Sequence, residues 1–131
     1  LSSRVFREKF RENYSRFGIA LLPLALTGFM AFHFYYLVNL GIQLPMLLSR
    51  NFDVALFRQL VITVPSHAVL IGQQIIIAAG FVWTLVTMYR IGRAANVSAG
   101  KALFGMAPHA VAAVVLATTF MTFMRQFFFA S

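Results

Sequence analysis

The sequence predicts an all-α integral membrane protein with three transmembrane helices, an N-terminal basic amphipathic helix and a short interfacial helix. Hydrophobic residues make up 60% of the 131 residues and charged residues 11%, which is outside the range of soluble domains. Three runs contain no Asp, Glu, Lys or Arg: residues 17–49, 59–89 and 102–124. A helix rises ~1.5 Å per residue, so roughly 20 apolar residues cross the ~30 Å hydrocarbon core, and each run is long enough.

We interpret the chain, residues 1–131, as one membrane domain. Its predicted parts are a basic amphipathic arm, a first span, an interfacial segment, a second span and a third span, at residues 1–16, 17–40, 46–60, 61–89 and 102–124. Three helices of this length leave little room for a domain outside the membrane.

The N-terminal arm combines positive charge with an aromatic stripe. Its aromatic residues are spaced for one face of a helix, and such a helix lies at the headgroup boundary. We expect its cations to bind anionic phospholipid, such as cardiolipin, or an acidic neighbouring subunit. These cations are Arg4, Arg7, Lys9, Arg11 and Arg16, and the aromatic residues are Phe6, Phe10, Tyr14 and Phe17.

Turn signals mark the predicted end of the first span. Gly41 suits the left-handed position after a helix and Pro45 blocks continuation, so a turn is predicted over residues 41–45. Asn51 as N-cap and Asp53 in the first turn then predict the interfacial helix. Near the start of the span, Pro23 is expected to kink the helix because it has no backbone N–H.

Polar and small residues inside the other two spans indicate where helices meet. Gln73 and Gln74 are adjacent and diverge by ~100°, so at least one is expected to face protein and to hydrogen-bond a neighbouring helix. Residues 78–80 form a small patch, and Ala113 with Ala117 form a small-xxx-small pair. Small residues of this kind let helices approach closely.

Lys and Arg are distributed unevenly between the two sides of the membrane. Three spans place the N-terminal segment and the second loop on one side, which then holds eight of the 11 Lys and Arg residues. The loop residues Arg90, Arg93 and Lys101 are grouped with the arm as lipid or partner contacts. The positive-inside rule then directs the N-terminus to the mitochondrial matrix and the C-terminus to the intermembrane space; in a bacterial inner membrane the N-terminus would be cytoplasmic.

The net charge of +8 does not indicate nucleic-acid binding, because the basic residues sit where helices leave the membrane. Residues that carry catalysis are nearly missing from the spans: Glu8, Glu12 and Asp53 all lie outside them, and the chain has no cysteine. We therefore expect no enzymatic activity from the chain by itself, no metal site and no cofactor. The alternative is that His33 and His67, both toward the outer side, bind haem b or a quinone.

The order Tyr14-Ser15-Arg16-Phe17-Gly18, an apolar span ending Tyr35-Tyr36-Leu37-Val38, and then Gly41-Ile42-Gln43-Leu44-Pro45-Met46-Leu47-Leu48 carries a family resemblance. Residues 14–48 resemble the mitochondrial membrane proteins called family with sequence similarity 210. The resemblance covers about a quarter of the chain and implies a mitochondrial inner-membrane setting without implying an activity.

A second resemblance concerns architecture. The chain is similar to the succinate dehydrogenase membrane anchors in size, in its three spans and in the expected matrix N-terminus. That resemblance implies a quinone contact at Ser15-Arg16 and a haem ligand at His67. No Asp follows the second span here, in contrast to those anchors.

Three functions follow as expectations. The first is a structural accessory subunit of a large mitochondrial inner-membrane complex, either a respiratory complex or ATP synthase, in contact with other membrane subunits and phospholipid. The second is a haem- or quinone-binding anchor of the succinate dehydrogenase type. The third is a component of an oligomeric transporter or channel, since three helices by themselves enclose little space.

Overall fold

The described part of the chain is helical throughout its length. The computed structural model describes residues 2, 10–52, 64–95 and 97–129. The helices are α2 (Phe10–Ile19), α3 (Leu22–Phe52), α5 (Ser66–Ala94) and α6 (Ala99–Phe129). Within these residues three stretches are long and apolar enough to cross a membrane: Arg11–Pro45, Ser66–Ala94 and Ala99–Gln126. The predicted fold class is therefore confirmed.

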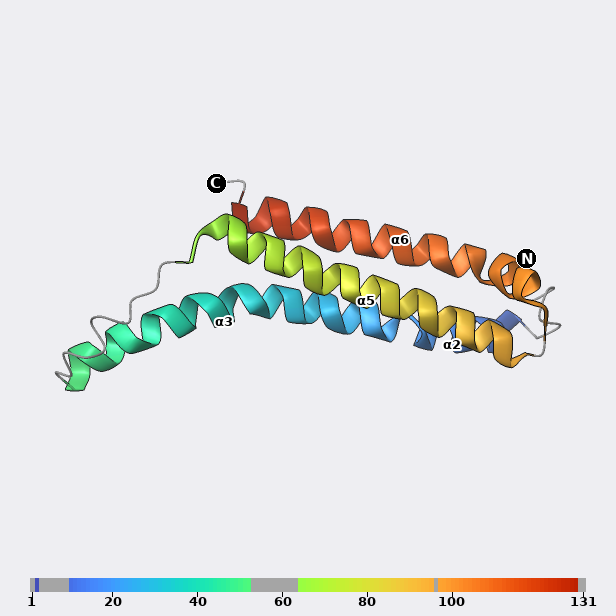
Figure 1. Ribbon diagram of the computed structural model, residues 1–131, viewed down its shortest axis with the longest axis horizontal. Coiled ribbons are helices and arrows are strands. Elements are labelled where there is room, and N and C mark those ends of the chain that lie inside the picture. Colours follow the sequence, from blue (N-terminus) through green and yellow to red (C-terminus); the bar gives the residue numbers. More distant parts are fainter. Residues whose placement is uncertain (1, 3–9, 53–63, 96, 130–131) are drawn as a thin grey trace.

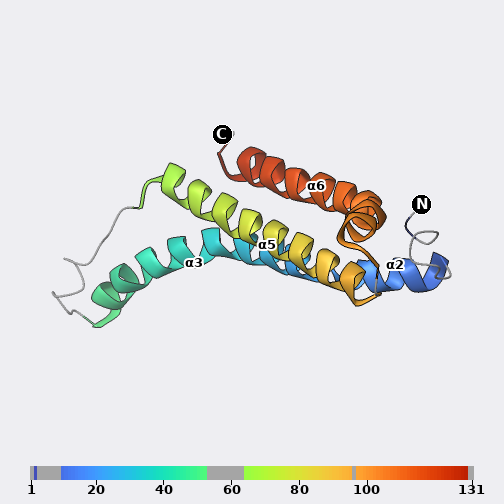
Figure 2. The ribbon, with the colours of Figure 1, turned by 45° about the vertical axis from the view of Figure 1, so that its right-hand side comes forward.

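Helix α5 is the centre of the bundle, with α3 on one side and α6 on the other (Figures 1 and 2). Each neighbour runs antiparallel to it, and only four residues join α5 to α6 (Figure 1). A buried stripe runs along α5 at steps of three or four residues, so that one side of the helix meets both neighbours. It consists of Val69, Gln73, Ile77, Gly80, Thr84, Met88 and Gly92.

Small residues set the closest approaches between helices. A side-chain Cβ on Gly80 of α5 would lie 2.7 Å from the Cβ of Thr27 in α3, so only hydrogen fits there. Gly28 of α3 makes room in the same way for the ring of Phe120 in α6. Ala113 and Ala117, the predicted small pair of the third span, are both buried. These contacts are the expected mode of packing where lipid gives helices no hydrophobic reason to associate.

The first span is broken near its start. Helix α2 ends at Ile19, and two tight backbone bonds, from Ala20 to the Phe17 carbonyl at 3.1 Å and from Leu21 to the Gly18 carbonyl at 3.0 Å, join it to α3. Pro23 explains the break, because it has no N–H to donate one turn back. The predicted span 17–40 is therefore two helices that meet at residues 20 and 21 rather than one.

The turn predicted over residues 41–45 does not form. Helix α3 continues through Gly41 and Pro45 to Phe52, and its last part diverges from α5 (Figure 1). Proline removes one hydrogen bond from a helix, yet the other backbone bonds of α3 remain, and together they carry the helix through residues 41–45. Residues 46–52 of the predicted interfacial segment belong to α3, and residues 53–60 lie outside the described part.

The other two spans also differ from their predicted limits. The described part of the second span becomes helical at Ser66, because Pro65 is the N-cap and the residue before a proline avoids helical geometry. At the other end α5 continues past Tyr89 to Ala94, and α6 occupies residues 99–129 rather than 102–124. The predicted limits followed the first charged residue, whereas both helices extend beyond it toward the aqueous side.

Candidate functional site

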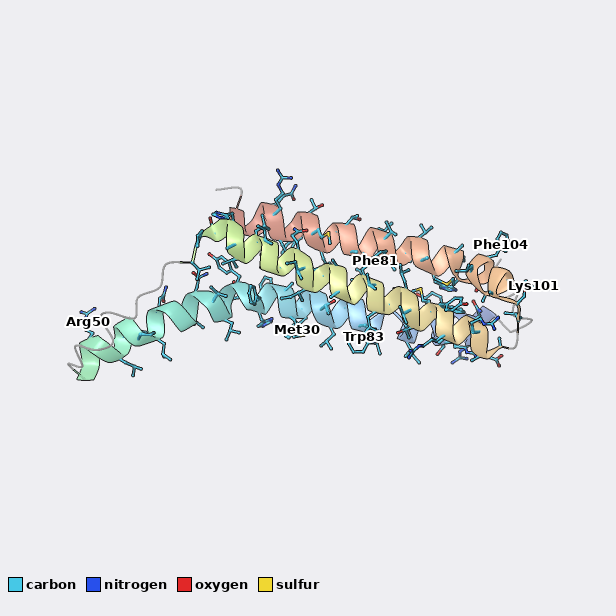
Figure 3. The ribbon with its side chains drawn as sticks, viewed as in Figure 1. Met30, Arg50, Phe81, Trp83, Lys101 and Phe104 are labelled. Carbon is cyan, nitrogen blue, oxygen red and sulfur yellow. The ribbon has the colours of Figure 1, made fainter. Side chains whose placement is uncertain are left out.

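Positive charge gathers at one end of the bundle, where α2, the end of α5 and the start of α6 come together (Figure 1). We call this the basic end; its described cations are Arg11, Arg16, Arg90, Arg93 and Lys101. Figure 3 shows Lys101 at this end and Arg50 at the opposite one, on the end of α3. The structure thus brings together residues that are far apart in the chain. Arg4, Arg7 and Lys9 lie outside the described residues.

The local structure at the basic end explains how the second loop holds its charges. Arg90 and Arg93 lie in the last two turns of α5, where the helix dipole favours cations. The guanidinium of Arg93 donates to the carbonyl of Val97 at 2.9 Å and so braces the short connection to α6. Only residues 95–98 separate the two helices. The connection is therefore much shorter than the gap between the predicted spans, which end at residue 89 and begin again at residue 102.

A polar and aromatic contact joins α2 to α6 just inside the basic end. Nε2 of His109 lies 3.2 Å from Oδ1 of Asn13, within hydrogen-bond distance. The imidazole also stacks on the ring of Phe17, with centroids 4.5 Å apart and planes 3° from parallel. Asn13 and Phe17 are both buried. His109 therefore fixes the position of the amphipathic helix, a role that the sequence did not reveal because the two residues are 96 positions apart.

The two histidines considered as a haem or quinone pair lie on exposed surfaces of different helices. Nδ1 of His33 lies 3.0 Å from the carbonyl oxygen of Phe29, and its ring packs on Phe29 of the same helix at 4.0 Å. Successive residues of a helix are ~100° apart, and His33 lies two residues after Ala31. The His33 side chain therefore points away from the face of α3 on which Ala31 meets α5. His67 lies in the first turn of α5 and is also exposed. Neither histidine is directed into the bundle interior.

Polar side chains do line the interior between the helices. Gln73 is completely buried, and its amide nitrogen donates to the Ala31 carbonyl of α3 at 2.9 Å and approaches the sulfur of Met124 in α6 at 3.6 Å. Gln74 donates to the carbonyl of Met121 at 3.3 Å. Both therefore bond neighbouring helices, as their sequence context indicated. Farther along α5, the buried hydroxyl of Thr84 has no hydrogen-bond partner among the described residues.

Toward the point where it leaves the bundle, α3 presents exposed leucine side chains. Leu37, Leu40 and Leu44 are 69%, 61% and 57% exposed, and their spacing of three and four residues places them on one face. Asn39, Gln43 and Arg50 lie on a different face of the same helix. The end of α3 is therefore amphipathic, a property hidden in the sequence by the predicted turn.

The described residues contain no group of three or more His, Cys, Asp or Glu side chains placed to hold a metal ion. No family model, curated protein or solved structure matches the chain.

Proposed function

We propose that this chain is a non-catalytic accessory subunit of a larger assembly in the mitochondrial inner membrane, either a respiratory complex or ATP synthase. The observation that carries the proposal is the extension of α3 beyond the bundle, with leucines exposed along one face. A second element, the basic end, is suited to anionic phospholipid such as cardiolipin on the matrix side.

The length of the extension follows from the pairing of α3 with α5. Ala31 lies beside Gln73, and Phe34 packs where a side chain on Gly72 would stand. Because the two helices are antiparallel, the start of α5 at Ser66 lies level with about residue 40 of α3. Residues 41–52 therefore extend past the bundle by ~18 Å.

Whether the exposed leucines indicate a protein contact depends on where they lie relative to the membrane. Leucines that face lipid inside the hydrocarbon are ordinary, since acyl chains are as apolar as they are. We take the start of α5 as the far membrane boundary, and this choice puts Leu40 and Leu44 at or beyond it. An amphipathic helix in that position buries its apolar face in a groove or against a helix of another protein.

The basic end supplies the complementary contact on the other side of the membrane. Five described cations converge there, and Glu12 is the one carboxylate among the described residues. Basic residues next to a membrane attract anionic headgroups by about 1 kcal/mol each. Together with the positive-inside rule, this supports a matrix-facing N-terminus.

Substitution of the exposed leucines tests the proposal. We expect Leu40→Ala with Leu44→Ala to abolish co-migration of the protein with a larger complex on native gels of gently extracted membranes. Removing both side chains from a buried contact costs about 4 kcal/mol, or roughly a thousandfold in affinity. The matched control is Leu22→Ala with Leu26→Ala, because these leucines are 62% and 61% exposed within the bundle. Identical migration of the two double variants, or a wild-type protein that migrates as a free bundle, would contradict the proposal.

A further inference from the structure

An open groove runs between α5 and α6 at the end of the bundle opposite the basic end. Its volume is about 1070 Å³, which is enough for a sizeable ligand. Its apolar walls are formed by Leu70, Ile71, Ile75, Ala78 and Met121. A second hollow of about 730 Å³ continues from it along the exposed face of α5; it shares Ile75 and Ala78, adds Ala79, Val82, Trp83 and Val86, and ends at Arg90 of the basic end.

In the first groove, between α5 and α6, the exposed polar groups lie at one end. Thr122, Arg125 and Gln126 lie on the last turns of α6, and all three are exposed. Gln74 borders the same region from α5, where its amide holds the two helices together. The first groove therefore has one cationic and hydrogen-bonding end and an apolar remainder, which the second hollow continues as far as Arg90.

The apolar stretch next to Arg125 is long enough for an acyl chain of one leaflet. From Ile71 to Val82, before the second hollow reaches Arg90, the helix rises by ~16 Å, about half of the ~30 Å hydrocarbon core. Arg125 lies level with about Leu70, one turn inside the start of α5, since Gln74 bonds the backbone of Met121 and Arg125 follows one turn later in α6. Its long side chain brings the guanidinium to headgroup depth, and the apolar walls lie at acyl-chain depth.

We infer that this groove binds a phospholipid with an anionic headgroup in the leaflet opposite the basic end. Arg125 pairs with the headgroup phosphate, Thr122 and Gln126 donate hydrogen bonds to its oxygens, and an acyl chain lies along Ile75, Ala78 and Val82. The guanidinium suits this role because its planar donors match phosphate oxygens.

The charge at the mouth favours a lipid over a transmembrane helix of another subunit. A helix would dock on the small residues Ala78 and Ala79, but it would have no use for a cation at headgroup depth. An anionic phospholipid satisfies both the charge and the apolar walls. The site is independent of the leucine face of α3, which belongs to another helix and another surface.

Trp83 makes the site measurable in the purified chain. It is the protein's one tryptophan, it is 67% exposed, and it lines the second hollow beside Val82, near the bilayer midplane. Figure 3 shows Trp83 on the outer side of the bundle and Phe81 on the side of α5 that faces α6. In phosphatidylcholine vesicles that contain a small fraction of phosphatidylglycerol brominated near the chain ends, we expect its fluorescence to be quenched more than the mole fraction predicts.

The preference is expected to be about fivefold over brominated phosphatidylcholine at the same mole fraction, the effect of one arginine near a membrane surface. Arg125→Gln should remove this preference, so that both brominated lipids quench Trp83 about equally. Ala78→Phe should reduce the preference by filling the groove. Arg50→Gln and Lys101→Gln are the controls, one at each end of the bundle and outside the groove, and both should keep the preference.

Each outcome decides the inference. Loss of the preference in Arg125→Gln and Ala78→Phe, with both controls unchanged, supports it. Quenching that follows the mole fraction in the wild type overturns it, and so does a preference that survives Arg125→Gln or that falls equally in Lys101→Gln. Shielding of Trp83 from both brominated lipids in the native complex would indicate a helix partner instead. Because the vesicle experiment uses the isolated chain, failure of the accessory-subunit proposal would leave its result intact.

Discussion

The side-chain nitrogen of Gln73 lies 2.9 Å from the carbonyl oxygen of Ala31 and donates a hydrogen bond across the interface between α3 and α5. The same nitrogen lies 3.6 Å from the sulfur of Met124, so one buried amide touches all three spans. Its oxygen, in contrast, has no hydrogen-bond partner among the described residues. The nitrogen of the Gln73 amide is therefore hydrogen-bonded, whereas its buried oxygen is not.

Two substitutions at Gln73 separate its volume from its polarity. Gln73→Ala leaves a cavity among three helices and should lower the free energy of unfolding by about 2 kcal/mol. Gln73→Leu keeps most of the volume and removes the unpaired oxygen together with the bond, so its effect should stay within about 1 kcal/mol. Denaturation in mixed detergent micelles, followed by Trp83 fluorescence, measures both.

Gln74→Ala is the matched control, since Gln74 is only half-buried and makes a longer bond of 3.3 Å. We expect a loss of about 0.6 kcal/mol there, the average for hydrogen bonds between membrane helices. A Gln73→Leu protein as unstable as Gln73→Ala would show that the bond, and not the volume, dominates.

The close approach of α3 and α5 at Gly80 predicts a strong steric effect. Gly80→Ala places a methyl group against Thr27, and the resulting overpacking should cost about 1–3 kcal/mol. Gly18→Ala is the control, because a Cβ there meets nothing within 4 Å. The unfolding titration in detergent compares the two.

Combining Gly80→Ala with Thr27→Ala should restore part of the lost stability, since the change removes two of the three clashing atoms. The restored part is the interaction energy of a double-mutant cycle. Additive effects of the two substitutions would mean that the helices are farther apart at this level than the structure places them.

The contact between Asn13 and His109 predicts that either residue controls the position of α2. Asn13→Ala and His109→Ala should each expose the junction between α2 and α3, where Ala20 is completely buried. Because the chain has no cysteine, a single Ala20→Cys substitution reports this by its rate of maleimide labelling. We expect labelling about fivefold faster in either variant, from the loss of about 1 kcal/mol of contact.

The control for this experiment is His33→Ala, which removes a histidine that packs on its own helix. Its labelling rate should equal that of the otherwise unchanged Ala20→Cys protein. Equal rates in all four proteins would show that the contact between α2 and α6 does not hold the amphipathic helix in place.

The basic end predicts the orientation of the chain in the membrane. A cysteine at Ser98, in the connection between α5 and α6, should react with an impermeant maleimide only from the matrix side. A cysteine at Ser66, at the start of α5, should react only from the opposite side. Labelling of intact mitoplasts and of inverted inner-membrane vesicles distinguishes the two, and the reverse pattern would contradict the positive-inside interpretation.

Hydropathy alone was sufficient to predict the three spans, because charge-free runs of this length have few other solutions. The limits of the helices were harder to predict. Gly41 and Pro45 form a strong turn signal, yet α3 passes through both, since the remaining backbone hydrogen bonds of the helix outweigh the loss of one at the proline. The amphipathic extension of α3 was hidden for the same reason.

Some of the interior contacts could be predicted from the sequence and others could not. Gln73 and Gln74 could be expected to bond other helices, because an amide in an apolar run needs a partner. The pairing of His109 with Asn13 could not, since it depends on α2 lying beside α6. Likewise, the groove beside Arg125 is lined by residues of both α5 and α6, and no local pattern in either helix records how the two pack.

The central place of α5 bears on how the protein is made. Helices α3 and α5 follow each other in the chain, and the bond from Gln73 to Ala31 forms between them without any contribution from α6. Helix α6, which leaves the ribosome after them, then docks on a surface that is already complete, bringing Met121 and Met124 to the two glutamines. The bundle can therefore assemble in the order of its synthesis, with a paired hairpin of helices in the insertion machinery before α6 is released.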